Sequence, residues 1–191
     1  MQSILKNYTN ELVIKNSKFI TYLFPMKNSS IDSFLEEVKK IHPKATHYCY
    51  AYIYDDIYRY SDDGEPSNTA GLPIYHVLEK EELNRICCIV VRYFGGIKLG
   101  AGGLVRAYTK AITSSLENIE KVSLMEGFVI RIHTNYDNVK NLDYLLKKYN
   151  ICKKEFLDDV FYTVEIPKDV LDSLHSYSYK ILEPIYIKDS N

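Results

Sequence analysis

The feature that most constrains the fold of this 191-residue chain is an apolar segment that runs directly into a glycine-rich loop. Residues 85–94 contain ICCIVV, which predicts a strand buried on both faces and therefore central in a sheet. Residues 95–103, GGIKLGAGG, form the loop, and residues 104–119 have the apolar spacing of an amphipathic helix. Together they predict a mixed domain, of class α+β, in which a helix begins at a glycine turn.

A second strand is predicted where tyrosines alternate with other residues. In residues 47–54, HYCYAYIY, side chains alternate strictly between the two faces of a strand. One face carries Tyr48, Tyr50, Tyr52 and Tyr54, and the other carries His47, Cys49, Ala51 and Ile53. The aromatic face suits either stacking against RNA bases or packing as half-exposed sheet surface, and both interpretations stay open.

The pattern of strands and helices starts again after about residue 121. Residues 127–133, 151–156, 160–166 and 185–187 have strand character, while 136–149 and 170–176 have helix character. That order, βαββαβ, is the ferredoxin-like arrangement. We therefore expect two domains, residues 1–122 and 123–191.

Composition excludes several classes of protein. With 46% hydrophobic and 26% charged residues, the chain has the balance of a folded globular protein. A formal net charge of −1 excludes a strongly basic nucleic-acid binder, although it is compatible with a local basic patch. No apolar run approaches the roughly 20 residues of a membrane span, and no signal peptide is visible. The four cysteines follow neither a disulfide framework nor a metal-binding pattern, so we expect a cytoplasmic protein without metal or cofactor.

The glycine loop is the strongest candidate for a binding site. Glycine permits positive φ and close approach of a ligand, and the first N–H groups of the following helix lack partners within it. The helix dipole adds positive charge there, which suits a phosphate. The residues expected to bind phosphate or nucleic acid are Arg92, Gly95, Gly96, Lys98, Gly100, Gly102, Gly103, Arg106 and Lys110.

The alternative for this loop is a tight structural turn without a ligand. Neither a Walker loop nor a Rossmann fingerprint is present to decide between the two interpretations. If the loop is only structural, a substitution at Gly102 should unfold the domain while changes to the cations should leave binding unaffected.

An acidic segment rich in turn residues precedes the central strand, at residues 61–73, SDDGEPSNTAGLP. Its candidate residues are Asp62, Asp63, Gly64, Glu65, Pro66 and Thr69. The carboxylates suit capping of turns, pairing with Arg92 and Arg106, contact with a partner, or Mg²⁺ binding and acid–base chemistry. Thr69 is placed to cap the helix expected after it.

His47 and Cys49 share a strand face and raise the possibility of a nucleophile with its base. Residues two apart on a strand lie about 6–7 Å apart at Cα, and no third residue is evident that would orient such a pair. Packing or a local hydrogen bond is the alternative. The catalytic residues, if any exist, stay unassigned.

Two of these segments together carry a family resemblance. SDDGEPSNTAGLP at 61–73 and IVVRYFGGIKLGAGGLVRAY at 89–108, with HYC at 47–49, are similar to the signature of the IMPACT/YigZ family, in particular its bacterial YigZ-type members. The similarity covers about residues 18–119. Asn68 departs from the pattern, because glycine is usual there; asparagine is the next best tolerated residue at positive φ, so the turn can survive.

The resemblance implies both a fold and a role. The IMPACT-type first domain should resemble the second domain of ribosomal protein S-five, with a left-handed βαβ crossover, and the second should resemble a ferredoxin-like domain of elongation factor G. It also implies a translation-associated regulatory protein whose partners are RNA or ribosome-associated factors, with no membrane. As parts of one signature, the acidic loop and the glycine loop should lie side by side.

Three functions compete at this point. The first is binding of RNA or the ribosome through the glycine loop, the second is regulation through a protein partner without nucleic acid, and the third is an enzyme acting on a phosphorylated small molecule. No nucleophile, nucleotide-binding lysine motif or metal cage supports the enzyme. Binding rather than catalysis is therefore the prediction, and nothing in the sequence sets an oligomeric state.

Overall fold

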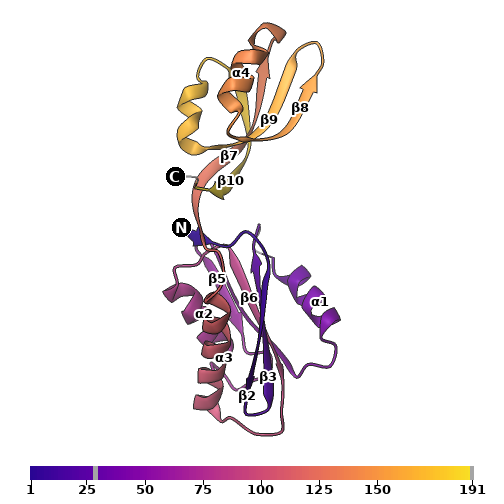
Figure 1. Cartoon of the computed structure of the whole chain (residues 1–191), viewed down its shortest axis with the longest axis vertical. Coiled ribbons are helices and arrows are strands. Elements are labelled where there is room, and N and C mark those ends of the chain that lie inside the picture. The colour runs from indigo at the N-terminus through magenta and orange to yellow at the C-terminus, as the bar shows by residue number, and fades with distance from the viewer. Residues whose placement is uncertain (28–29, 190–191) are drawn as a thin grey trace. The chain divides into compact units, whose positions relative to one another are not determined.

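The computed structural model describes residues 1–27 and 30–189, and the chain divides into two compact units, Met1–Val122 and Ser123–Asn191 (Figure 1). In chain order the elements are β1 (Gln2–Ser3), β2 (Tyr8–Ile14), β3 (Ser17–Pro25), α1 (Asp32–Ile41), β4 (His47–Tyr54), β5 (Ile57–Ser61), α2 (Gly71–Lys80), β6 (Ile86–Tyr93), α3 (Ala101–Leu116), β7 (Val122–Thr134), the 3₁₀ turn η1 (Tyr136–Asn138), α4 (Val139–Leu146), β8 (Asn150–Phe156), β9 (Val160–Pro167), η2 (Lys168–Leu174) and β10 (Ser178–Lys188). Each unit has a hydrophobic core of its own.

The first unit is built on a sheet in the order β2-β3-β6-β4-β5, in which every neighbouring pair is antiparallel. The predicted central position of the apolar strand is confirmed, since β6 lies in the middle. Because β3 and β4 are both antiparallel to β6, they run parallel to each other, and α1 connects them as a βαβ crossover. Sequence reasoning missed β1 and β2; β2 is an edge strand whose residues are all exposed or half-buried.

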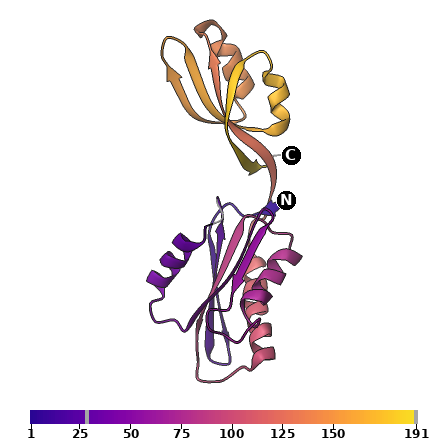
Figure 2. The same cartoon turned by 180° about the vertical axis from the view of Figure 1, so that it is seen from behind.

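Helices cover both faces of this sheet, α1 on one side and α2 with α3 on the other (Figure 1, Figure 2). Side chains of β6 alternate between the two layers, which explains its continuous apolar run. Ile86, Cys88 and Val90 pack in the core with α2 and α3. Cys87, Ile89 and Val91 pack in the core with α1.

The tyrosine face of β4 lies under α1. Tyr52 is buried in that core, and Tyr48, Tyr50 and Tyr54 pack against it. Tyr48 also donates a hydrogen bond to the carbonyl of His42, 2.5 Å away, just after α1 ends. The suggestion that this face stacks RNA bases is therefore wrong, because a helix covers it.

The second unit follows the ferredoxin-like order. Its four long strands pair antiparallel as β10-β7-β9-β8. Alternate residues of β9, from Val160 to Ile166, are buried with Leu142 and Leu146 of α4 and Leu174 of η2. The predicted βαββαβ arrangement is confirmed, with a 3₁₀ segment in place of the second helix.

Candidate functional site

The acidic loop and the glycine loop meet at one cavity, as the shared signature predicts. The cavity has a volume of about 320 Å³. It is lined by Glu65, Pro66, Arg92, Phe94, Lys98, Leu99, Gly100, Ala101 and Leu104. Strand β6 brings Arg92 and the residues after it to the same end of the first unit as the residue pair Glu65–Pro66, which follows β5 in the chain.

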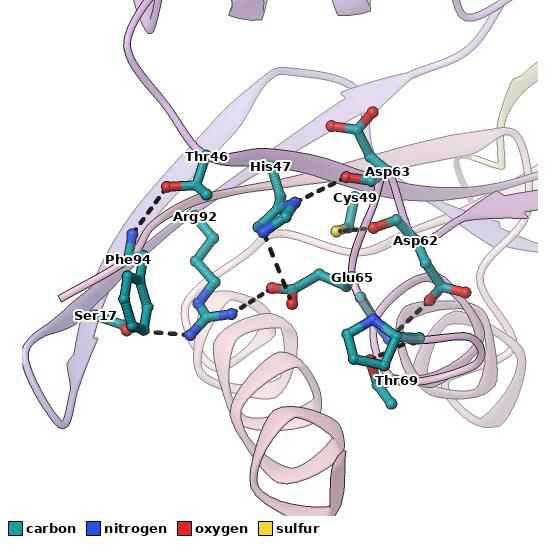
Figure 3. A network of polar contacts seen from close by, with 12 residues as sticks. Ser17, Thr46, His47, Cys49, Asp62, Asp63, Glu65, Thr69, Arg92 and Phe94 are labelled. Carbon is teal, nitrogen blue, oxygen red and sulfur yellow. Dashed lines mark hydrogen bonds and ion pairs between the residues drawn. The ribbon is translucent and has the colours of Figure 1, made fainter. Parts of the chain in front are cut away.

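Glu65 and Arg92 form a buried ion pair at this cavity. Arg92 Nη1 donates to Glu65 Oε1 at 2.6 Å, and the two side chains are only 5% and 3% exposed. The guanidinium also lies 5.5 Å and 5.6 Å from the ring centroids of Phe19 and Phe94. Figure 3 shows Arg92 and His47 converging on Glu65. Arg92 was expected among the free cations of an anion site, but here its charge is already neutralised inside the protein.

Further polar side chains complete the network around this pair. The Tyr108 hydroxyl of α3 donates to Glu65 Oε1 at 2.8 Å, and Arg92 Nη2 donates to Ser17 Oγ at 3.3 Å. The Gly95 N–H donates to the same Ser17 oxygen at 3.2 Å. Ser17 was not anticipated, since a lone serine before a strand gives no sequence signal of such a role.

Cys49 belongs to the network but is not an activated nucleophile. Its Sγ lies 3.0 Å from the Asp62 carbonyl and 3.2 Å from the Tyr108 hydroxyl. Burial raises the pKa of this thiol far above its ordinary value, and nearby Glu65 adds to the shift. Burial likewise raises the pKa of Tyr108. Cys49 is also fully buried, and the ring nitrogens of His47 face the Asp63 carbonyl and Glu65. The two residues therefore do not form the nucleophile–base pair that their shared strand face suggested.

His47 is turned toward the acidic loop. Its Nδ1 donates to the carbonyl of Asp63 at 2.8 Å, and its Nε2 lies 3.9 Å from Glu65 Oε2. The ring also fills the space beside Gly64, whose φ is +84°. His47 therefore connects the β4 strand to the loop and faces the carboxylate of the ion pair.

The other two carboxylates of the loop hold backbone groups. Asp62 accepts hydrogen bonds from the N–H groups of Asn68, Ala70 and Gly71, at 2.8, 2.9 and 2.9 Å. It thereby satisfies backbone donors at the start of α2, where negative charge is favourable. Asp63 Oδ2 accepts from the N–H of Tyr48 at 2.6 Å.

Thr69 does not have its expected role, and Asn68 does. The helix α2 has no capping hydrogen bond from the side chain at its own N-cap, and Thr69 instead donates to the carbonyl of Pro66 at 2.6 Å. Asn68 adopts φ of +60°, which confirms that asparagine can stand where the family pattern has glycine.

The glycine loop contains one position, Gly95, that no residue with a side chain can occupy. A Cβ on Gly95 would lie 2.0 Å from the backbone carbonyl of Asn16, so the chain passes too close for any side chain. Gly96 and Gly100 adopt φ of +85° and +70°. The loop ends at Gly100 rather than Gly103, because α3 begins at Ala101.

Gly102 and Gly103 therefore lie in the first turn of α3 and not in the loop. A Cβ on Gly102 would meet only Arg106 Nη1, at 3.6 Å, which is an ordinary contact. The purely structural interpretation of the loop predicts that a Gly102 substitution unfolds the domain, and this geometry speaks against that prediction. At Gly103 a Cβ would lie 3.1 Å from the Leu99 side chain, which is tighter.

Three of the four predicted cations are exposed at the surface. Lys98 lines the cavity, while Arg106 and Lys110 follow on α3. Within residues 1–27 and 30–189, none of these three forms an ion pair. Phe94, half-exposed at the cavity, was not among the predicted site residues; an aromatic next to the glycine loop was the available signal.

In the described part of the chain, no group of three or more His, Cys, Asp or Glu side chains is placed to hold a metal ion. None of the helices described combines the length and apolar character needed to cross a membrane.

Comparisons with known proteins agree on one family. The Impact N-terminal domain matches residues 15–116. The IMPACT family member YvyE of Bacillus subtilis is 45% identical over 133 residues, which are 67% of this chain and 60% of that protein. YigZ of Escherichia coli is 41% identical over 112 residues, 56% of this chain and 55% of that protein. The matches thus span somewhat over half the length of these relatives.

A solved structure is similar over nearly the whole chain. The crystal structure of a hypothetical protein superposes with a TM-score of 0.63 at 30% sequence identity. It covers 95% of this chain and 97% of that one, so the likeness includes both units.

Proposed function

Because the chain belongs to the IMPACT family, we propose that it is a translation-associated regulatory protein that binds RNA, including the RNA of the ribosome, through the start of α3. Support comes from the separation of charge at the cavity. The carboxylates of the acidic loop accept hydrogen bonds from groups inside the protein, whereas Lys98 and Arg106 are exposed and can bind a ligand. This observation carries the proposal.

The carboxylates of the acidic loop do not oppose an incoming phosphate. Glu65 is paired with Arg92 and accepts from Tyr108. Asp62 is engaged by three backbone N–H groups, and Asp63 accepts from Tyr48. Neither Asp62 nor Asp63 lines the cavity, and the charge of Glu65 is balanced there by Arg92. Lys98 therefore adds a positive charge to a lining whose carboxylate, Glu65, is already paired.

The start of α3 supplies donors and positive potential. Its N-cap residue is Gly100, and no capping hydrogen bond is made by that residue's side chain, because glycine has none. Lys98 lies in the lining of the cavity just before this end, and the Arg106 guanidinium lies over the first turn, close to Gly102. Free helix N–H groups with nearby cations are a general seat for phosphate, and they bind the backbone of RNA without reading its sequence.

Exposed apolar residues beside the site favour a second candidate. Ile97 and Val105, 46% and 37% exposed, border the same loop and helix. A regulator that binds a protein partner through this surface would bury these two side chains. Its affinity for the partner would not depend on Lys98 and Arg106, although these charges could change the association rate.

The test is a binding titration with single-stranded RNA at several salt concentrations. Replacing Lys98 and Arg106 together by glutamine should reduce the slope of log K against log salt by about 1.4, since each phosphate contact contributes about 0.7. A matched control is Lys40→Gln with Lys44→Gln, two exposed lysines at and just after α1, on the opposite face of the sheet. If the parent protein binds no RNA, or both double variants behave alike, the RNA proposal is refuted and the protein-partner candidate takes its place.

A further inference from the structure

The cavity beside α3 joins an aromatic surface to an anion seat. Its volume of about 320 Å³ is within the usual size range of small-ligand sites. Apolar groups of Phe94, Leu99 and Leu104 form much of its wall, and the start of α3 forms another part. A ligand that fills it therefore needs a flat or apolar portion together with a negative charge.

Phe94 is held in place yet left half-exposed. Its backbone N–H donates to Thr46 Oγ1 at 3.0 Å, and the Arg92 guanidinium lies 5.6 Å from its ring centroid. The residue nevertheless keeps 46% of its surface exposed. An aromatic ring fixed on one side and open on the other is a platform on which a base can stack.

Arg92 lies in the wall of this cavity, with its charge already paired. Arg92 Nε is buried and has no hydrogen-bond partner among the described residues, although both other guanidinium nitrogens have one. Its side chain is 5% exposed and lines the cavity with Gly100 and Ala101. Because Nε is buried, a ligand in the cavity would contact the start of α3, Lys98 and Phe94 rather than this atom.

From these features we infer that the cavity holds one unpaired nucleotide of RNA, with its base on Phe94 and its phosphate at the start of α3. This inference rests on the proposed function and narrows it to single-stranded RNA. In a duplex the bases are stacked inside the helix and cannot reach a side-chain ring, whereas an unpaired base can be turned outward. Phe94 is thus the residue that selects single strands, while Lys98 and Arg106 attract either form.

The experiment compares a fluorescent 12-nucleotide single strand with a 12-base-pair RNA duplex at one salt concentration. Phe94→Leu removes the ring but keeps an apolar side chain, and should weaken binding of the single strand by about tenfold. Phe94→Tyr should bind like the parent. The control is Ile97→Ala, which removes an equally exposed apolar side chain, 46%, from the same loop and should leave affinity unchanged. Circular dichroism confirms that each variant is folded.

The outcomes separate the two proposals. Single-strand affinity that falls in Phe94→Leu alone, with duplex affinity unchanged, supports the inference. Two results overturn the inference and leave the proposed function standing. One is an RNA affinity that falls when Lys98 and Arg106 are replaced but not when Phe94 is replaced. The other is an equal affinity of the parent protein for single-stranded and duplex RNA. Equal losses in Phe94→Leu and Ile97→Ala show a general apolar contact and also overturn it. Absence of all RNA binding overturns both.

Discussion

Arg92 brings a full positive charge into the core of the first unit, where Glu65 is the one carboxylate within ion-pair distance among the described residues. If either charged side chain of this pair is replaced by a neutral one, the remaining charge is buried without a partner. Removing both can leave the stability nearly unchanged, because the desolvation penalty disappears together with the attraction. The pair therefore fixes the geometry of the cavity more than it stabilises the fold.

Glu65→Gln should lower the free energy of unfolding of the first unit by about 3 kcal/mol or more, since it leaves the Arg92 charge buried without its partner. The double variant Glu65→Gln with Arg92→Gln should recover most of that loss. Urea unfolding followed by circular dichroism measures both. Arg92→Gln alone completes the comparison. If the losses of free energy in the two single variants simply add up to the loss in the double variant, the side chains are not coupled and the pair has no such role.

Two glycines of the signature should respond in opposite ways to the same change. Gly95→Ala forces a Cβ to within 2.0 Å of the Asn16 backbone and should prevent stable folding. Gly102→Ala meets only an ordinary contact with Arg106 and places a better helix former in α3, so it should stabilise the protein by up to about 1 kcal/mol. Thermal unfolding of the two variants decides the matter; a Gly102→Ala protein that fails to fold would contradict the geometry.

At the scale of elements, His42 links the end of α1 to the sheet through hydrogen bonds. This residue follows the helix directly, and its Nε2 and Nδ1 lie 2.7 Å from the Tyr22 hydroxyl of β3 and 3.0 Å from the Tyr93 hydroxyl of β6. Desolvation by burial, with the charge of Lys18 nearby, lowers the pKa of His42 below its ordinary value. The neutral ring is thus the form that the folded protein prefers.

Stability should consequently fall in mildly acidic solution. Above about pH 6.5 His42 is neutral in both the folded and unfolded states and contributes nothing to the pH dependence. As the pH falls below that value the unfolded chain takes up the proton first, so the unfolded state is favoured until the lower folded pKa is reached. His42→Gln should flatten the change in unfolding midpoint as the pH falls below about 6.5. An unchanged profile in this variant would show that another group is responsible.

At the scale of the whole molecule, the second unit has a hydrophobic core that is separate from the two cores on either side of the first unit's sheet. The core of Ser123–Asn191 consists of β7, β9, α4 and η2 side chains and includes residues of that unit alone. A compact unit with its own core is the usual definition of a domain. We propose that residues 123–191 are such a domain.

A fragment of residues 123–191 should therefore fold without the rest of the chain. It should show a cooperative thermal transition in circular dichroism and dispersed amide resonances by NMR. Its core side chains, such as Leu142, Tyr162 and Leu174, are fully buried within the unit. A fragment without a cooperative transition would mean that the second unit depends on the first.

The sequence by itself was enough to predict those strands and helices that depend on the pattern of neighbouring residues. The apolar run of β6, the alternation of β4 and the order of elements after residue 121 follow from side-chain periodicity, which is a property of neighbouring residues. The turn at Asn68 follows in the same way from the backbone preference of one residue. The adjacency of the acidic and glycine loops came from the family resemblance, and the structure bears it out.

Only the tertiary structure decided what these residues do once they are together. Arg92 lost its expected role because Glu65, 27 positions earlier, pairs with it in the core. Gly95 is indispensable because the backbone of Asn16 passes beside it, and the tyrosines of β4 are covered because α1 crosses above them. Such outcomes depend on which strands are neighbours and which face a helix covers. Charge, burial and close approach are properties of that arrangement, and no local pattern of residues contains it.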